Sequence, residues 1–72
     1  MDQKRIGAFI SALRKEKNMT QKDLAQKLGI TDRAISKWEN GRGMPEVSLM
    51  KPLCEALDIS INELLSGERI EQ

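Results

Sequence analysis

The sequence contains no histidine and a single cysteine among its 72 residues. Histidine is a common metal ligand and general base in proteins, and the carboxylates of this chain are scattered rather than grouped at metal-ligand spacing. No glycine-rich loop of the nucleotide-binding kind is present. We therefore expect no enzymatic activity, no metal site and no cofactor.

The lone cysteine, Cys54, has no partner for a disulfide within the chain. Its leucine neighbours indicate a buried, reduced thiol in the cytoplasm. No apolar run approaches the ~20 residues of a membrane-spanning helix, and no signal peptide is recognised. Aromatic residues are limited to Phe9 and Trp38. A chain of this length forms one small domain at most, with a modest core.

No charge of either sign dominates, since the formal net charge is +1, but the two signs are unevenly distributed. Residues 1–42 carry ten Lys or Arg and five Asp or Glu, whereas residues 43–72 carry two basic and six acidic residues. A basic half of this kind is attracted to phosphates, and the acidic half is repelled by them. Helix faces solvated by charge are the alternative explanation, but the basic half coincides with the motif described next.

Residues 20–41, TQKDLAQKLGITDRAISKWENG, contain two short helix patterns joined by a turn of about four residues. Thr20 and Asp23 form a capping box at the first helix, which Gly29 ends. Thr31 caps the second helix, and Gly41 ends it. Each helix has an apolar face, formed by Leu24, Ala25 and Leu28 in the first and by Ile35 and Trp38 in the second. This arrangement is typical of the helix-turn-helix, which places its second helix in the major groove of DNA.

Three further helices are predicted, which gives an all-α, five-helix bundle. The first spans about residues 3–17 after the cap Asp2, because its apolar residues recur at helical spacing. We place the start of the fourth near Leu49, with Ser48 as its cap, because Pro52 is tolerated only in a first turn; it ends near residue 58. The fifth spans residues 61–66, between a capping box formed by Ser60 and Glu63 and a terminating glycine.

The predicted domain comprises residues 1–67, and residues 68–72 form a frayed tail. The apolar residues of all five helices and their connections supply the predicted core: Ile6, Phe9, Ile10, Leu13, Leu24, Leu28, Ile30, Ile35, Trp38, Val47, Leu53, Leu57, Ile59, Leu64 and Leu65.

Taken together, these segments resemble the lambda-repressor-like helix-turn-helix family, also called the Cro/cI or XRE type, over roughly residues 4–66. The resemblance is carried by Thr20-Gln21, Leu24-Ala25, Leu28-Gly29, Ile35-Ser36, Trp38-Glu39-Asn40-Gly41, Pro45, residues 53–60 and Glu63-Leu64-Leu65. It implies a five-helix DNA-binding domain whose third helix reads base edges.

The exposed face of that third helix would carry the base contacts: Asp32, Arg33, Ser36 and Lys37. Arg33 is the strongest candidate, because its planar fork can bind guanine O6 and N7 together. Without the resemblance, Arg33 and Lys37 would be interpreted as a solvated face. Asp32 has two equal interpretations, a bond from cytosine N4 or a favourable charge at the start of its own helix.

Four residues on the two flanks are predicted to contact DNA phosphates: Gln21, Lys22, Asn40 and Arg42. The resemblance assigns Gln21 this role, and the positive end of a helix favours it physically. Arg14 and Glu39 match a partly buried salt bridge of the family, so we expect a structural role for them rather than DNA contact. Trp38 is expected to be a core residue rather than a DNA contact.

These observations predict a sequence-specific, DNA-binding transcriptional regulator, with repression as the default outcome. We expect a homodimer on double-stranded DNA, formed through Ile61, Leu65 and Ile70. The alternative is an antitoxin or protein-interaction module with a protein partner, whose DNA binding is autoregulatory. The acidic second half would then be the partner surface.

Overall fold

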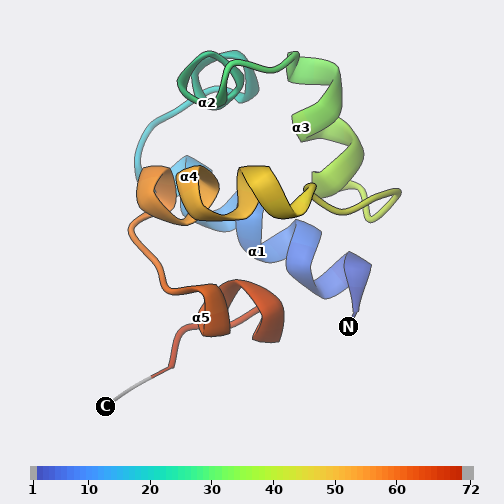
Figure 1. Ribbon diagram of the computed structural model, residues 1–72, viewed down its shortest axis with the longest axis vertical. Helices are drawn as coiled ribbons and strands as arrows, with labels where there is room; N and C mark the ends of the chain where they lie inside the picture. The colour runs from blue at the N-terminus through green and yellow to red at the C-terminus, as the bar shows by residue number, and fades with distance from the viewer. Residues whose placement is uncertain (1, 71–72) are drawn as a thin grey trace.

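Residues 2–70, the part of the chain that the computed structural model describes, form five α-helices and no strand (Figure 1). In chain order these are α1 (Gln3–Glu16), α2 (Gln21–Leu28), α3 (Asp32–Glu39), α4 (Val47–Leu57) and α5 (Ile61–Ser66). The predicted all-α bundle is therefore confirmed. α1 packs against α3, α4 and α5, while α2 packs against α3 and α4. Within the described residues, no helix is both long and apolar enough to cross a membrane.

Side-chain caps define the starts of α1, α2, α3 and α5, as the sequence predicts. The Asp2 side chain accepts hydrogen bonds from the backbone N–H groups of Lys4 and Arg5 in the first turn of α1. The capping box at α2 is complete, with the Asp23 N–H donating to Thr20 Oγ1 at 3.0 Å and the Thr20 N–H donating to Asp23 Oδ2 at 2.9 Å. Ser60 and Glu63 form the same box at α5. Each cap satisfies backbone donors that a helix start would otherwise leave unpaired.

The predicted start of α4 is wrong, because the helix begins at Val47 rather than near Leu49. Its N-cap is Glu46, which makes no side-chain cap hydrogen bond, and Pro52 lies inside the helix. The N–H that proline lacks would have bonded to the carbonyl of Ser48. Ser48 lies in the first turn and is exposed, so solvent can hydrate that carbonyl instead. The proline is therefore less costly here than in a buried helix interior.

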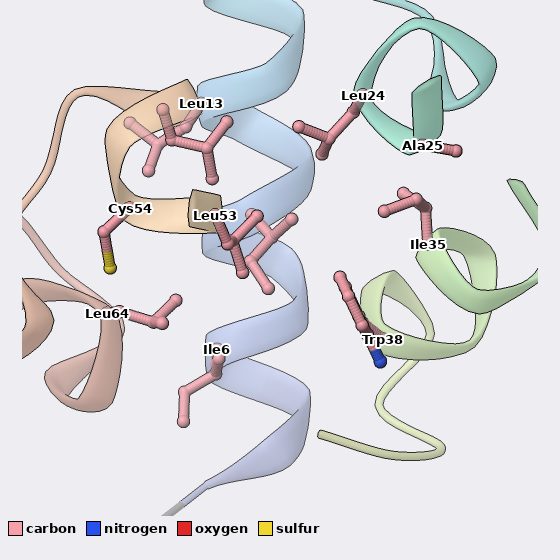
Figure 2. Close-up of a cluster of buried hydrophobic side chains, with 11 residues drawn as sticks. Ile6, Leu13, Leu24, Ala25, Ile35, Trp38, Leu53, Cys54 and Leu64 are labelled. Carbon is pink, nitrogen blue, oxygen red and sulfur yellow. The ribbon is translucent and has the colours of Figure 1, made fainter. Parts of the chain in front are cut away.

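The core lies between α1 and the other helices (Figure 2). Its buried members are Ile6, Ile10, Leu13, Leu24, Ala25, Ile35, Trp38, Leu53, Cys54, Leu57 and Leu64. The predicted Phe9, Leu28, Ile30 and Ile59 are partly buried and pack against this cluster.

Two predicted core residues are not in that cluster. Val47 is 85% exposed. It shares a helical stripe with Met50 and Cys54, but it is the first residue of α4 and no other element covers it. Leu65 is only half-buried. Cys54 is buried, as predicted.

The tail beyond α5 contacts the body of the domain as far as Ile70. Glu68 forms an ion pair with Arg5, and Arg69 Nη2 lies 2.7 Å from Glu16 Oε1. The Ile70 N–H donates to Glu63 Oε2 at 3.0 Å. Exposed ion pairs contribute about 0–1 kcal/mol each, so they hold this end only weakly. The frayed tail stays a prediction, and residues 71–72 of it lie outside the described residues.

Gly7, which the sequence analysis did not single out, sets the distance between α1 and α3. A Cβ atom at this position would lie 2.1 Å from the Trp38 carbonyl oxygen and 3.0 Å from that of Glu39. Both neighbours are backbone atoms, which cannot rotate away. The two helix backbones can therefore approach this closely only because residue 7 has no side chain.

We predict that Gly7→Ala destabilises the domain by about 1–3 kcal/mol, because α1 must move away from α3. For a domain of this size, 1 kcal/mol corresponds to a change in Tm of about 4–8 °C. Thermal unfolding followed by circular dichroism measures the effect. Helix propensity alone favours alanine by about 1 kcal/mol, so an increase in Tm would contradict the close contact.

Candidate nucleic-acid interface

The α2–turn–α3 unit directs one face of α3 inward and the other outward. α2 ends at Gly29 in the left-handed conformation, with φ of 69°. Thr31 then caps α3 by accepting from the Ala34 N–H at 3.3 Å. Ile35 and Trp38 are buried in the core. Since these two residues anchor the inner face, the polar residues of α3 face outward, as the sequence predicts.

Five residues on the outer face of α3 and just beyond its end line a concavity of about 320 Å³, which we call the α3 hollow: Arg33, Ser36, Lys37, Asn40 and Arg42. All five are predicted DNA contacts. The structure thus brings the predicted phosphate contacts Asn40 and Arg42 together with the predicted base contacts. Three other predicted DNA contacts do not line the hollow, namely Asp32, Gln21 and Lys22.

The cations of the α3 hollow are not neutralised by any other side chain in the part of the chain that the structure describes. Among residues 2–70, Arg33, Lys37 and Arg42 form no ion pair. The remaining arginines each pair with a glutamate: Arg5, Arg14 and Arg69. The positive charge of the hollow is therefore available to an anionic ligand.

Hydrogen bonds within the hollow orient its smaller polar groups. Asn40 Nδ2 donates to the Ser36 carbonyl oxygen at 2.7 Å and to Ser36 Oγ at 3.3 Å. Because Ser36 Oγ accepts from Asn40, its own hydroxyl proton can donate to a ligand. Gly43 lies beneath the aliphatic part of Lys37, since an added Cβ would be 3.2 Å from Lys37 Cε. The loop after α3 therefore supplies Arg42 to the hollow and packs Gly43 against Lys37, a contact that the sequence pattern does not indicate.

A buried ion pair joins α1 to the end of α3. Arg14 Nε lies 2.6 Å from Glu39 Oε2, and Arg14 Nη2 donates to Glu39 Oε1 at 3.0 Å. The side chains are only 9% and 6% exposed. Arg14 Nη1 also donates to the Met19 carbonyl oxygen at 2.7 Å, in the turn before α2. This bidentate geometry is the strong form of an arginine–carboxylate contact.

Gln21, the first residue of α2, is bonded to the same carboxylate. Its Nε2 donates to Glu39 Oε1 at 3.1 Å. Burial raises the pKa of Glu39, but hydrogen bonds from Arg14 and Gln21 and the charge of Arg14 outweigh it, so the pKa of Glu39 lies below its ordinary value of 4.5. The Gln21–Glu39 contact joins two different helices, and neither the local spacing nor the family resemblance indicates it.

A family model described as helix-turn-helix matches residues 10–64, so the chain belongs to the helix-turn-helix family. The structure resembles that of the P22 c2 repressor protein in complex with synthetic operator 9T, with a TM-score of 0.83 and 33% identity. This match covers 88% of the present chain and 96% of the repressor chain. The resemblance to lambda-repressor-like domains is thereby confirmed.

Two curated relatives carry regulatory names. The chain is 43% identical over 61 residues to the HTH-type transcriptional activator BcrR of Enterococcus faecalis, a match that covers 85% of this chain. It is also 39% identical over 59 residues to the uncharacterized HTH-type transcriptional regulator YqaE of Bacillus subtilis. That match covers 82% of this chain. The chain spans 30% of BcrR and 51% of YqaE.

We predict that Glu39→Ala lowers the free energy of unfolding by about 3–5 kcal/mol, because Arg14 would keep a buried charge without its partner. Glu16→Ala is the matched control, since it removes a glutamate from an exposed pair and should change stability by at most about 1 kcal/mol. Urea unfolding measures both values. Equal effects of the two substitutions would show that the buried pair has no special structural role.

We also predict that this contribution depends on pH. A carboxyl whose pKa is lower in the folded state contributes stability above its unfolded pKa, and that contribution is lost as the pH falls through the folded value. The difference in unfolding free energy between the natural chain and Glu39→Gln should therefore shrink below pH 4.5. Urea unfolding at pH 7, 4 and 3 measures it. A difference that is constant or grows in acid would contradict the lowered pKa.

Proposed function

We propose that this chain is the DNA-binding domain of a sequence-specific transcriptional regulator, with repression as its main activity. The observation that carries the proposal is the α3 hollow, in which α3 and the residues just after it bring together two oriented polar groups and three cations that form no ion pair within residues 2–70. A helix that presents such a face can enter the major groove, where base edges offer acceptors.

The residues nearest the start of α3 would read the DNA sequence through contacts to base edges. Arg33 is exposed and close to the N-terminus of the helix, so it is placed to donate to guanine O6 and N7. Lys37 lies one turn further on, and Ser36 has a hydroxyl proton to donate. Asp32, outside the hollow, would accept from cytosine N4 or stabilise the start of α3.

Phosphate contacts would fix the domain on the duplex without reading sequence. Gln21 and Lys22 lie at the start of α2, where backbone N–H groups and the helix dipole favour anions. Asn40 and Arg42 would contact the backbone on the other flank. The acidic surplus of residues 43–72 would keep the rest of the molecule away from DNA.

The proposed function needs no chemical step, since DNA binding uses only the donors and positive charge that the hollow offers. A regulator of this kind would act in the cytoplasm, where bacterial or phage DNA is found.

The regulator would act as a homodimer. Ile61 and Ile70 are 41% and 46% exposed, and Leu65 is half-buried between them in sequence. These residues belong to α5 and the tail, at the end of the molecule away from α2 (Figure 1). Pairing of two copies through this surface would present two α3 helices to half-sites about 34–36 Å apart.

Selection from a random DNA library at about 0.15 M salt tests the function. We expect a two-fold motif with half-sites one helical turn apart. The double variant Arg33→Ala/Lys37→Ala should lose the motif, and Lys51→Ala, which removes an exposed charge of α4, should retain it. Salt-sensitive enrichment without a motif would indicate phosphate binding only, and would favour the alternative of a protein-interaction module.

The base-reading and phosphate-binding roles predict different effects on the selected site. Arg33→Ala should relax the preference at one base position, at a cost of about 1–3 kcal/mol for the preferred base. Gln21→Ala should weaken binding to all sequences similarly. Titrations against the selected duplex and against single-base variants separate these effects. Unchanged affinity and preference in Arg33→Ala would show that α3 docks differently.

A further inference from the structure

Glu39, the last residue of α3, is hydrogen-bonded to residues of both α1 and α2. Its two carboxylate oxygens accept from Arg14 of α1 and from the Gln21 amide at the start of α2. The Arg14 bonds explain how the charge of Glu39 is balanced. The Gln21 bond is not needed for that balance, and Gln21 lies at the edge of the proposed DNA surface.

We propose that Glu39 is a positioning residue for DNA binding, because it fixes the Gln21 amide with its nitrogen available to a phosphate. This inference rests on the proposed function and adds a role for a residue that does not itself touch DNA. The Arg14–Glu39 pair then does more than stabilise the fold, since the same carboxylate orients a phosphate-binding group.

The chemistry of the two groups gives the direction of the effect. An ionised carboxylate only accepts hydrogen bonds, so it selects the nitrogen rather than the oxygen of the Gln21 amide. A phosphate likewise accepts only, so it needs an N–H. One N–H of Gln21 Nε2 donates to Glu39 Oε1, and within residues 2–70 the second has no protein acceptor. An amide without this anchor could present its carbonyl oxygen to the phosphate, which would be repelled.

The anchor is itself held rigidly. Glu39 is 6% exposed on its side chain and bonded to Arg14 through both oxygens. Arg14 also holds the Met19 carbonyl in the turn that leads into α2. The orientation of Gln21 is therefore set relative to the end of α3, next to the α3 hollow.

A double-mutant cycle tests the proposal with the whole chain and the duplex obtained by selection. Glu39→Gln keeps the size of the side chain but replaces one acceptor oxygen with a donor. We expect it to weaken DNA binding by about 3–10-fold, as expected for a single hydrogen bond. In the Gln21→Ala background, Glu39→Gln should cause no further loss. Gln26→Ala, from the exposed side of α2, is the matched control and should leave the effect of Glu39→Gln intact.

A purely structural role for Glu39 predicts a different result, namely the same fold-loss in both backgrounds or no loss at all. Either result would overturn the positioning role. Thermal unfolding of each variant confirms that affinity is compared between folded proteins. If the unsubstituted chain selects no DNA sequence, the proposed function fails; if it does and the cycle is additive, only the positioning role fails.

A second measurement needs no substitution and so does not depend on variants that fold. In the ¹⁵N-labelled chain, the chemical shifts of the two side-chain amide protons of Gln21 should be further apart than those of a free glutamine amide, since only one proton is bonded to Glu39. Addition of duplex DNA should shift the free proton and leave the bonded one nearly unchanged. The exposed Gln26 provides the reference for a free amide. Amide protons of Gln21 that behave like those of Gln26, with and without DNA, would overturn the proposal.

Discussion

The buried ion pair between Arg14 and Glu39 is the constraint on which the rest of the structure depends. It connects the end of α1 to the end of α3, and the third nitrogen of Arg14 holds the turn that leads into α2. A buried charge is costly without a partner, so both side chains are confined to the one geometry that satisfies them. Close to this pair, Gly7 lets the α1 backbone lie against the last carbonyls of α3. The Arg14–Glu39 ion pair and the close backbone contact at Gly7 therefore both fix the position of α3 against α1.

The way the arginines are paired explains how a domain with almost no net charge can present a cationic surface on α3. The arginines outside the hollow are neutralised by glutamates, whereas the cations of the hollow have no such partner among the described residues. The uneven charge of the two halves of the sequence becomes, in three dimensions, a concentrated positive site. Asn40 and Ser36 add hydrogen-bonding groups whose orientation is already set before a ligand arrives. Such preorganisation reduces the entropy lost on binding.

Local features of the structure could be predicted from the sequence pattern itself, whereas the one contact between helices that was expected, the Arg14–Glu39 pair, came from the family resemblance. The caps at Thr20 and Ser60 and the stripe of Ile35 and Trp38 depend on spacing within a few residues, and the structure confirms them. The start of α4 could not be predicted, because the penalty of Pro52 depends on whether the Ser48 carbonyl, one turn earlier, is exposed to solvent in the folded domain. The same is true of the close contact at Gly7 and of the Gln21–Glu39 bond, which joins residues 18 positions apart. The residues of the α3 hollow were all predicted as DNA contacts, but the packing of Gly43 against Lys37 beside them was not.

The most direct test of this account is a chemical-shift map of the ¹⁵N-labelled chain titrated with its selected duplex. The account predicts that the perturbed backbone amides fall in two groups, residues 20–23 at the start of α2 and residues 33–43 through α3 and its loop. The amides of α4 and of residues 61–66 should change little at a protein concentration where the oligomeric state is constant. Perturbations centred on α4 or on the acidic second half, with α3 unaffected, would contradict the account, because DNA would then bind a face other than the α3 hollow.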